Sequence, residues 1–325
     1  MLNSGEISSD QNVLSFCIPT YGQPKHLRKT LESLIGQNLE GVEILIRDDN
    51  LDSETERVVK EYISKLPIRY FRMTKEGIDR AFIFLSKEAR GKFVWWFGDD
   101  ILTQGSFEHV LGFLNNNHNV DFAYINSTDY SQNNFSVKII DTFRFNNRND
   151  VVSILKDQLG FCSALLLRRE LLLSGLVPAE KSIGTSWVTF FLVLHVLERG
   201  EDFYFLNGAN FFSEIKPPGE SRWYDSFLIH GVNFSIVALK FKNNFKSSTI
   251  RLLLREKFSR SCRAVVVERA LGFETGFAAS KPNFLKLFML YWSYPELYKA
   301  LPMLLMPRFI LKRLYKFYIQ FRRIR

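Results

Sequence analysis

The stretch Gly91-Lys-Phe-Val-Trp-Trp-Phe-Gly-Asp-Asp-Ile-Leu102 decides the fold of this 325-residue chain. Its apolar run from Phe93 to Phe97 does not alternate with polar residues. Such a run is typical of a strand that is buried on both faces, as in a parallel sheet covered by helices. Hydrophobic residues make up 46% of the chain, with 31 Phe and 5 Trp, so the chain can form a substantial hydrophobic core.

Two adjacent carboxylates, Asp99 and Asp100, follow Gly98 at the end of this run. A helix over 106–114 is expected next, with Thr103 as its candidate N-cap. The aspartates should therefore lie at the carboxyl end of a central strand, where open α/β sheets bind ligands. Neighbouring carboxylates repel each other unless they are solvated or face a cation such as Mg²⁺ or Mn²⁺. These residues alone leave both a solvated turn and a metal site open.

The chain before this stretch alternates between buried strands and amphipathic helices. Such alternation indicates βαβ units, so we predict an α/β fold with a mostly parallel sheet flanked by helices. The expected strands cover 13–18, 42–46, 68–72 and 93–97. Three helices are expected between them: one that begins at Pro24, one over 52–65 and one over 79–90.

Polar side chains collect where each expected strand ends. They are Thr20 and Tyr21, then Asp48 and Asp49, then Glu76, Asp79 and Arg80, and finally Asp99 and Asp100. A carboxylate can accept from a base N–H or a ribose hydroxyl, and a guanidinium can hold a phosphate through its planar fork. A nucleotide site at one edge of the sheet is therefore plausible. No GxGxxG or GxxxxGK[ST] motif follows the first strand, which argues against dinucleotide-binding and P-loop proteins.

Four segments in this order resemble the successive motifs of family 2 glycosyltransferases with the GT-A fold. The segments are Val13–Tyr21, Val42–Asp49, Gly77–Phe82 and Trp96–Asp100. Within that family the chain is most similar to bacterial O-antigen dideoxyhexosyltransferases of the abequosyltransferase type. The resemblance covers roughly residues 13–115.

The resemblance also implies roles for particular residues. Pro19, Thr20, Tyr21, Asp48 and Asp49 would hold the nucleoside, and Asp79 and Arg80 would stand near the donor ribose or diphosphate. Asp100, with Asp99 beside it, would bind Mg²⁺ or Mn²⁺. The chain departs from the family pattern because Gly98-Asp99-Asp100 is one residue short and Ala81 replaces an Asn. These departures could alter the choice of donor or weaken metal dependence.

The chain should divide into a GT-A domain over residues 1–225 and a helical region over 226–325. The first domain would contain a nucleotide-sugar half, 13–102, and an acceptor half, 103–225. The acceptor half should hold strands at 120–125 and 135–145 and a helix at 185–198.

The acceptor half also contains candidate site residues, each with a competing interpretation. Glu180 is the nearest acid to the place where relatives carry a catalytic base, and a solvated loop glutamate is the competing interpretation. Arg222, Trp223 and Tyr224 lie in a Pro/Gly-rich loop and suit acceptor binding, because an aromatic face can cover a sugar ring; a packed connection is the alternative. His195 is interpreted as a core residue.

The C-terminal segment from Phe309 to Arg325 combines basic and aromatic residues without an acid, and the whole chain carries a net charge of +9. This pattern is typical of a helix that lies on an anionic membrane surface, and a helix packed on its own domain is the alternative. No nucleic-acid motif occurs. With no secretory signal and no cysteine framework, the expected location is cytoplasmic, peripheral on the inner face of the plasma membrane.

Together these features predict an enzyme that moves a sugar from a nucleoside diphosphate-sugar to a hydroxyl of a lipid-linked saccharide, as in O-antigen-like biosynthesis. Two alternatives are kept. One is a nucleotidyltransferase, which usually has a Gly-rich basic loop after the first strand. The other is a catalytically degenerate GT-A protein that only binds or scaffolds.

Overall fold

The computed structural model describes residues 2–3, 13–98, 100–129, 134–135, 137–139, 141–208, 211–213, 227–271 and 284–323. The chain divides into two compact units, unit 1 over Met1–Ile215 and unit 2 over Lys216–Arg325. The boundary expected after residue 225 falls in 214–226, which lies outside the described residues.

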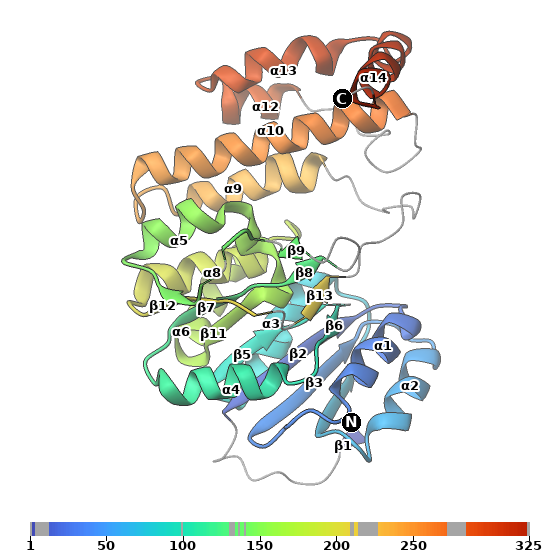
Figure 1. Ribbon diagram of the computed structural model, residues 1–325, viewed down its shortest axis with the longest axis vertical. Coiled ribbons are helices and arrows are strands. Elements are labelled where there is room, and N and C mark those ends of the chain that lie inside the picture. Colours follow the sequence, from blue (N-terminus) through green and yellow to red (C-terminus); the bar gives the residue numbers. More distant parts are fainter. Residues whose placement is uncertain are drawn as a thin grey trace. The chain divides into compact units, whose positions relative to one another are not determined.

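Unit 1 is built on a sheet of nine described strands (Figure 1). Their spatial order is β1 (Leu2–Asn3), β4 (Ile68–Arg72), β3 (Val42–Asp48), β2 (Leu14–Thr20), β5 (Phe93–Trp96), β11 (Leu165–Arg168), β7 (Phe122–Ile125), β12 (Phe203–Leu206) and β10 (Phe143–Arg144). The central strands β4, β3, β2 and β5 pair in parallel, as do β7 and β12. Strands β1, β11 and β10 join antiparallel.

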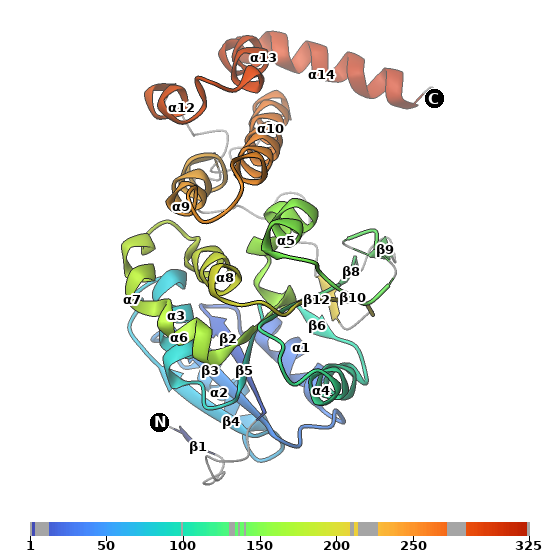
Figure 2. The same ribbon diagram turned by 90° about the vertical axis from the view of Figure 1, so that its left-hand side faces the viewer.

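Helices cover both faces of this sheet (Figure 2). One face carries α1 (Pro24–Leu34), α2 (Glu54–Tyr62) and α4 (Ser106–Asn116), and the other carries α3 (Ile78–Glu88), α6 (Arg169–Ser174) and α8 (Val188–Arg199). The predicted fold, a mostly parallel sheet flanked by helices, is therefore confirmed.

The two tryptophans of β5 explain why its sequence does not alternate. Trp95 packs edge-on against Phe107 of α4, with ring centroids 5.7 Å apart. Trp96 points to the other face and packs against Phe82 of α3 at 5.5 Å. Both tryptophans are fully buried, so each face of the strand requires an apolar side chain.

Two local predictions in unit 1 are wrong. Residues 135–145 do not form one strand, because the described part holds only the ends of two short ones, β9 (Asn134–Phe135) and β10. Thr103 is not the N-cap of α4, since Gly105 takes that position with a φ of 78°. The chain reverses at Gly105 in the left-handed region, which a glycine enters without steric cost.

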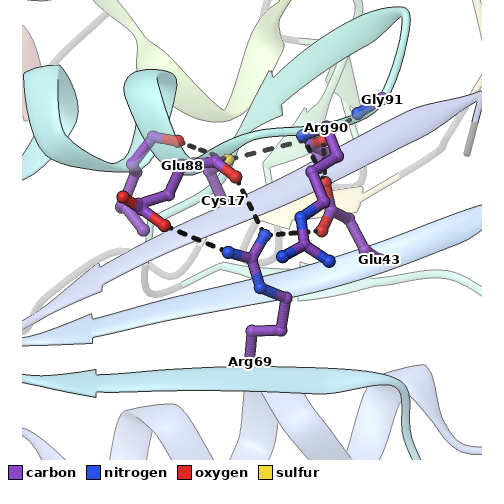
Figure 3. A network of polar contacts seen from close by, with 8 residues as sticks. Cys17, Glu43, Arg69, Glu88, Arg90 and Gly91 are labelled. Atoms are coloured by element: carbon purple, nitrogen blue, oxygen red, sulfur yellow. Dashed lines mark hydrogen bonds and ion pairs between the residues drawn. The ribbon is translucent and has the colours of Figure 1, made fainter. Parts of the chain in front are cut away.

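The amino ends of the central strands are tied together by one buried acid (Figure 3). The carboxylate of Glu43 accepts hydrogen bonds from Ser15 Oγ and the Arg90 N–H, each at 2.6 Å, and from Arg69 Nη1 at 2.9 Å. Next to it, a Cβ at Gly91 would lie 2.7 Å from the backbone of β2. This network fixes three strands at the edge opposite to their polar ends.

The other elements of unit 1 surround this sheet. A second sheet contains β6 (Ile101–Leu102), β13 (Phe211–Ser213), β8 (Thr128–Asp129) and β9. The remaining helical elements are α5 (Arg148–Leu155), η1 (Lys156–Gly160), η2 (Cys162–Ala164), α7 (Leu176–Ala179) and η3 (Glu180–Ser182).

Unit 2 is helical, as expected for the C-terminal region. Its elements are a π-helical segment η4 (Phe227–Asn233), α9 (Phe234–Lys240), α10 (Ser247–Leu271), α12 (Phe284–Tyr291), α13 (Pro295–Leu305) and α14 (Arg308–Arg323). Tyr291 is fully buried, packs 4.2 Å from the Phe258 ring and donates to the Gly231 carbonyl at 2.9 Å. Among the described helices, none has the length and apolar character needed to cross a membrane.

Candidate active site at the carboxyl ends of the parallel strands

The register of the parallel strands places the predicted polar residues side by side. Thr20 at the end of β2 is paired with Asp48 at the end of β3, and Asp48 is paired with Arg72 of β4. The Asp49 N–H then donates to the Thr20 carbonyl at 3.0 Å. Since β5 pairs with the other side of β2, its carboxyl end lies at the same edge. The strand ends that were expected to converge do so.

Asp48 is fully buried, and both of its oxygens have partners. Tyr70 donates its hydroxyl to Oδ2 at 2.8 Å, and the Asn50 N–H donates to Oδ1 at 3.0 Å. Burial raises the pKa of Asp48, and these two donors partly oppose that shift. The carboxylate is therefore held rigidly where the nucleoside was expected.

Asp49 is held by a buried arginine that the sequence analysis did not single out. Arg47 is 1% exposed, and its Nε donates to Asp49 Oδ1 at 2.6 Å. The same guanidinium donates to Glu76 Oε2 at 2.7 Å and to the Arg80 carbonyl at 3.1 Å. One side chain thus joins β3, the loop before α3 and the first turn of α3.

Asp79 has a partner set that was not expected. Its Oδ2 accepts from the N–H groups of Gly184 and Ser186 at 2.8 and 2.9 Å, and its Oδ1 accepts from the Val188 N–H at 3.2 Å. Burial raises the pKa of Asp79, and the backbone donors act in the opposite direction. The carboxylate caps the start of α8 from a different helix, so its oxygens are already engaged within the protein.

Ser186 explains why this loop needs such an anchor. It has a φ of 64°, in the left-handed region that a residue with a Cβ rarely adopts. Gly184, two residues earlier, also has a positive φ of 85°. Asp79 holds both N–H groups, which keeps the loop in this conformation beside the first turn of α3.

Asp100 lies in a turn that two other elements fix. The hydroxyl of Thr30 in α1 donates to the Asp100 carbonyl at 2.9 Å, and the Gly98 N–H donates to Ser163 Oγ of η2 at 2.9 Å. Asp100 itself is 5% exposed. Asp99 lies outside the described residues.

A divalent cation at this turn would have one described protein carboxylate as its ligand, that of Asp100. In the part of the chain that the structure describes, no group of three or more His, Cys, Asp or Glu side chains could hold a metal ion. Mg²⁺ is commonly bound through one or two carboxylates, with phosphate oxygens and water as the other ligands. Asp100 can supply one such carboxylate.

The exposed rim of the site is cationic and aromatic. Tyr21 is 45% exposed, and Lys75 Nζ lies 4.2 Å from its ring centroid. Pro19 is half-buried at the end of β2, and Arg80 is exposed at the start of α3. This rim leaves positive charge and an aromatic face accessible next to the buried acids.

Glu180 is not brought to this edge. It is 54% exposed, and the carboxylate lies 4.0 Å from Lys87 Nζ. Lys87 and Asp79 are separated by eight residues of α3, which is about 12 Å along a helix. The structure places Glu180 beside the far end of α3.

Of the other residues singled out in the acceptor half, the structure describes only His195. Arg222, Trp223 and Tyr224 lie outside the described residues. His195 is buried and shares a 3.0 Å hydrogen bond with Ser174 Oγ, as expected for a core residue.

The residues that sequence reasoning missed are mostly supports of the site. They are Arg47, Tyr70, Ser163 and the loop Gly184–Val188. Arg47 did carry a signal, because a charged residue in an apolar strand must find partners inside the protein. The others carried none, since their roles depend on contacts between distant segments.

The sequence of unit 1 matches a known family over its first part. Residues 15–173 match the family described as glycosyl transferase family 2. The abequosyltransferase RfbV of Salmonella typhimurium is 34% identical over 109 residues, which cover 31% of this chain and 32% of that protein. The minor teichoic acid biosynthesis protein GgaB of Bacillus subtilis is 29% identical over 110 residues, covering 32% of this chain and 12% of that protein. The chain thus spans about a third or less of these relatives.

Solved structures share the fold over a longer range. Residues 1–349 of TarS from S. aureus, in complex with UDP-GlcNAc, give a TM-score of 0.62 at 15% identity, covering 90% of this chain and 81% of that chain. The mannosyltransferase PcManGT from Pyrobaculum calidifontis, in complex with GDP-Man and Mn²⁺, gives 0.53 at 12% identity, covering 97% and 91%. At these identities the likeness concerns the fold, and that fold is GT-A.

Proposed function

From the glycosyl transferase family 2 domain that residues 15–173 form, we propose that the protein transfers a sugar from a nucleoside diphosphate-sugar to a hydroxyl of a lipid-linked saccharide. One observation carries this proposal: the carboxyl ends of β2, β3 and β5 lie at one edge of the sheet, where Thr20 is paired with Asp48 and Asp100 follows the end of β5 by four residues. The relative RfbV, an abequosyltransferase, supports a surface polysaccharide of the O-antigen kind as the product.

In this proposal, the nucleoside lies against Pro19, Thr20, Tyr21 and the two acids Asp48 and Asp49. Asp48 is prepared for such a contact because Tyr70 and the Asn50 N–H already fix its orientation. Arg80, exposed at the start of α3, is available to the donor diphosphate. Asp79 acts in this proposal as the residue that holds the neighbouring loop.

The departing diphosphate needs its negative charge stabilised. Asp100 would hold Mg²⁺ or Mn²⁺, and such a cation stabilises the charge of the leaving group when it is bound. Burial of Asp100 and the two hydrogen bonds that fix its turn preserve the position of the carboxylate. We do not assign the base that takes the acceptor proton to Glu180, because that residue lies beside the far end of α3.

The acceptor part of the proposal rests on α14. Arg308, Lys312, Arg313 and Lys316 are exposed on this helix. Each basic residue near an anionic leaflet contributes about 1 kcal/mol to binding, and added salt weakens this attraction. We place the protein on the inner face of the plasma membrane, where it would meet a lipid-linked acceptor.

The decisive experiment is a thermal-shift screen of UDP-, GDP-, CDP- and dTDP-sugars with and without Mn²⁺, followed by assays of transfer and hydrolysis with the sugar that stabilises the protein. A glycosyltransferase should be stabilised by one class of donor and should release its nucleoside diphosphate. Stabilisation without turnover would favour a binding protein instead. Release of pyrophosphate from a nucleoside triphosphate would favour a nucleotidyltransferase.

Calorimetry with the stabilising nucleotide then tests the nucleoside contacts. Replacing either Asp48 or Asp49 by Ala should weaken binding by roughly ten- to a hundredfold, because a charge-assisted contact is worth about 1.5–3 kcal/mol. Wild-type affinity in both single variants would refute the assignment of these two acids.

A further inference from the structure

Helix α12 carries an apolar stripe that no other part of the described chain covers. Leu285, Phe288 and Met289 of α12 are 71%, 52% and 70% exposed, and Trp292, which directly follows the helix and donates its N–H to the Phe288 carbonyl at 2.9 Å, is 60% exposed. Their spacing of i, i+3, i+4 and i+7 places them on one face of a helix. Tyr291, on another face, is fully buried, so the helix is docked and its orientation is fixed.

The two helices that follow α12 in unit 2 also carry exposed apolar side chains. Tyr298 of α13 donates its hydroxyl to the Trp292 carbonyl at 2.8 Å, which joins α13 to the end of α12. The exposed apolar side chains of the two following helices are Tyr298, Met303 and Leu305 of α13 and Phe309, Ile310, Leu314 and Phe317 of α14. Helices α12, α13 and α14 lie on one side of α10 (Figure 1, Figure 2).

The charge around these side chains has one sign. Residues 284–323 contain eight basic side chains and one acid, Glu296. That acid pairs with Arg255 of α10 at 2.6 Å, so it is directed toward the unit's own helix. Lys286 and Lys299 are exposed on α12 and α13, which carries the positive charge beyond α14.

We propose that the exposed apolar face of α12, extended by α13, inserts into the interface of an anionic phospholipid bilayer. The occupant must be apolar where the stripe lies and negative around it, and headgroups above acyl chains provide both. A second copy of the chain would bring its own positive charges against those of the first copy, and like charges repel. Helices this short and charged are suited to lie in the interface rather than to span the bilayer.

Membrane binding through this apolar surface differs from binding through the charges of α14 in its dependence on salt. Electrostatic attraction to a leaflet is screened by salt, whereas burial of apolar side chains persists at high ionic strength. The proposal therefore predicts a component of vesicle binding that salt does not remove. It goes beyond the transfer reaction and does not depend on the donor.

The test measures binding of the full chain to phosphatidylglycerol-containing vesicles at low and high salt. The variant Leu285→Ser/Met289→Ser should bind about tenfold or more weakly at high salt, because two large side chains no longer enter the interface. Val177→Ser is the matched control: Val177 is 75% exposed in α7 of unit 1, and its loss should leave binding unchanged. All three residues are on the surface, so these variants should fold.

Trp292 reports insertion directly. Its emission should shift to the blue on vesicles and be quenched by brominated lipid, and Trp292→Phe should lose that signal while the other four tryptophans, Trp95, Trp96, Trp187 and Trp223, remain. Wild-type binding by the double variant, or unchanged Trp292 emission in bound protein, would overturn the proposal. So would sedimentation in which the wild type self-associates and the double variant does not, since a second copy would then cover the face.

Donor binding separates this proposal from the proposed function. The double variant should bind the nucleotide found in the screen with wild-type affinity. If no donor binds either protein, the enzymatic proposal fails while the vesicle result stands.

Discussion

Arg47 shows how a single buried cation can organise the candidate site. Its guanidinium donates to the carboxylate of Asp49 just after β3, to that of Glu76 in the loop before α3, and to the Arg80 carbonyl in α3. The ring of Phe84 lies 5.0 Å from it, so the cation is enclosed as well as hydrogen-bonded. A lysine cannot reproduce these contacts, because its ammonium is a compact point charge without a planar fork.

Replacing Arg47 with Lys should therefore weaken nucleotide binding as well as the fold. We expect the affinity for the nucleotide to fall about tenfold, since a lost charge-assisted contact is worth about 1.5–3 kcal/mol and Asp49 would lose its orientation. Calorimetry and a thermal melt on the same variant measure the two effects.

Arg69 provides the matched control for this prediction. It lies on the adjacent strand, and its guanidinium also binds two acids, Glu43 at 2.9 Å and Glu88 at 3.0 Å (Figure 3). It does so at the amino ends of the strands, away from the site. Arg69→Lys should lower the melting temperature and leave nucleotide affinity unchanged. Equal loss of affinity in both variants would mean that Arg47 acts only on stability.

In the proposed function, Asp100 is the residue that would hold the metal ion. Asp100→Asn keeps the size of the side chain and the backbone carbonyl that Thr30 binds, so the turn should persist. Transfer activity should fall by at least a hundredfold, because a cation that stabilises the leaving diphosphate contributes several kcal/mol. Unchanged turnover with an unchanged melting temperature would refute the metal assignment.

At the scale of elements, the start of α8 depends on a residue of α3. Asp79 accepts from the N–H groups of Gly184, Ser186 and Val188, and the last of these belongs to a fully buried residue, where the donor would otherwise be unpaired. The contact links α3 to the loop before α8. Through it, Asp79 contacts Gly184 and Val188, which follow it in the sequence by 105 and 109 positions.

Asp79→Asn should lower the free energy of unfolding by about 1–3 kcal/mol, because the amide can accept at only one of its two ends. Asp52→Asn is the control: Asp52 also accepts at both oxygens, from the Glu54 N–H and from Asn50 Nδ2, but it is exposed before α2, so water can replace a lost contact. Urea unfolding compares the two. Wild-type stability with lost nucleotide affinity would instead place Asp79 on the donor.

Helix α14 has an inner face and an outer face, which changes how its role should be tested. Leu311 is buried within unit 2, where α14 packs along α10, whereas Lys312 and Lys316 are exposed. Deletion after Pro307 would remove the buried leucine together with the charges. A charge reversal is cleaner, because it leaves the inner face intact.

The variant Lys312→Glu/Lys316→Glu should keep its melting temperature and lose binding to anionic vesicles at low salt. Reversing two charges removes roughly 2 kcal/mol or more of attraction, so the affinity should fall at least thirtyfold. Lys60→Glu/Lys87→Glu, which reverses two exposed lysines of unit 1, is the control for net charge. An equal loss in both variants would show that overall charge, not α14, directs the protein to the surface.

At the scale of the whole molecule, the two units carry separate parts of the proposal. The donor residues from Pro19 to Asp100 all lie in unit 1, and the exposed apolar and basic helices lie in unit 2. Each unit has its own buried core, for example around Trp95 in unit 1 and around Tyr291 in unit 2. A domain with its own core can fold alone.

A chain that ends at Ile215 should therefore fold, bind the nucleotide with wild-type affinity and fail to bind vesicles. Circular dichroism, calorimetry and co-sedimentation measure these three properties. A truncated chain that folds but no longer binds the nucleotide would show that unit 2 contributes to the donor site. Vesicle binding by unit 1 alone would place the membrane contact elsewhere.

The sequence by itself determined the central fold and the edge where the site lies. The run at Phe93–Phe97 predicted a strand buried on both faces, and the alternation of strands and helices indicated a parallel sheet. The carboxyl ends of parallel strands meet at one edge, so Thr20, Asp48 and Asp100 could be grouped from local patterns. These features depend on residues close together in the chain, which is why periodicity could find them.

Only the tertiary structure decided which polar groups are engaged inside the protein. It joined Asp79 to a loop more than 100 residues away, gave Asp49 to Arg47 and paired Glu180 with Lys87. It also showed that the apolar stripe of α12 stays exposed, although the pattern alone would assign it to a core. Hydrogen-bond partners that lie far apart in the sequence meet only when the chain is folded, so local patterns do not identify them.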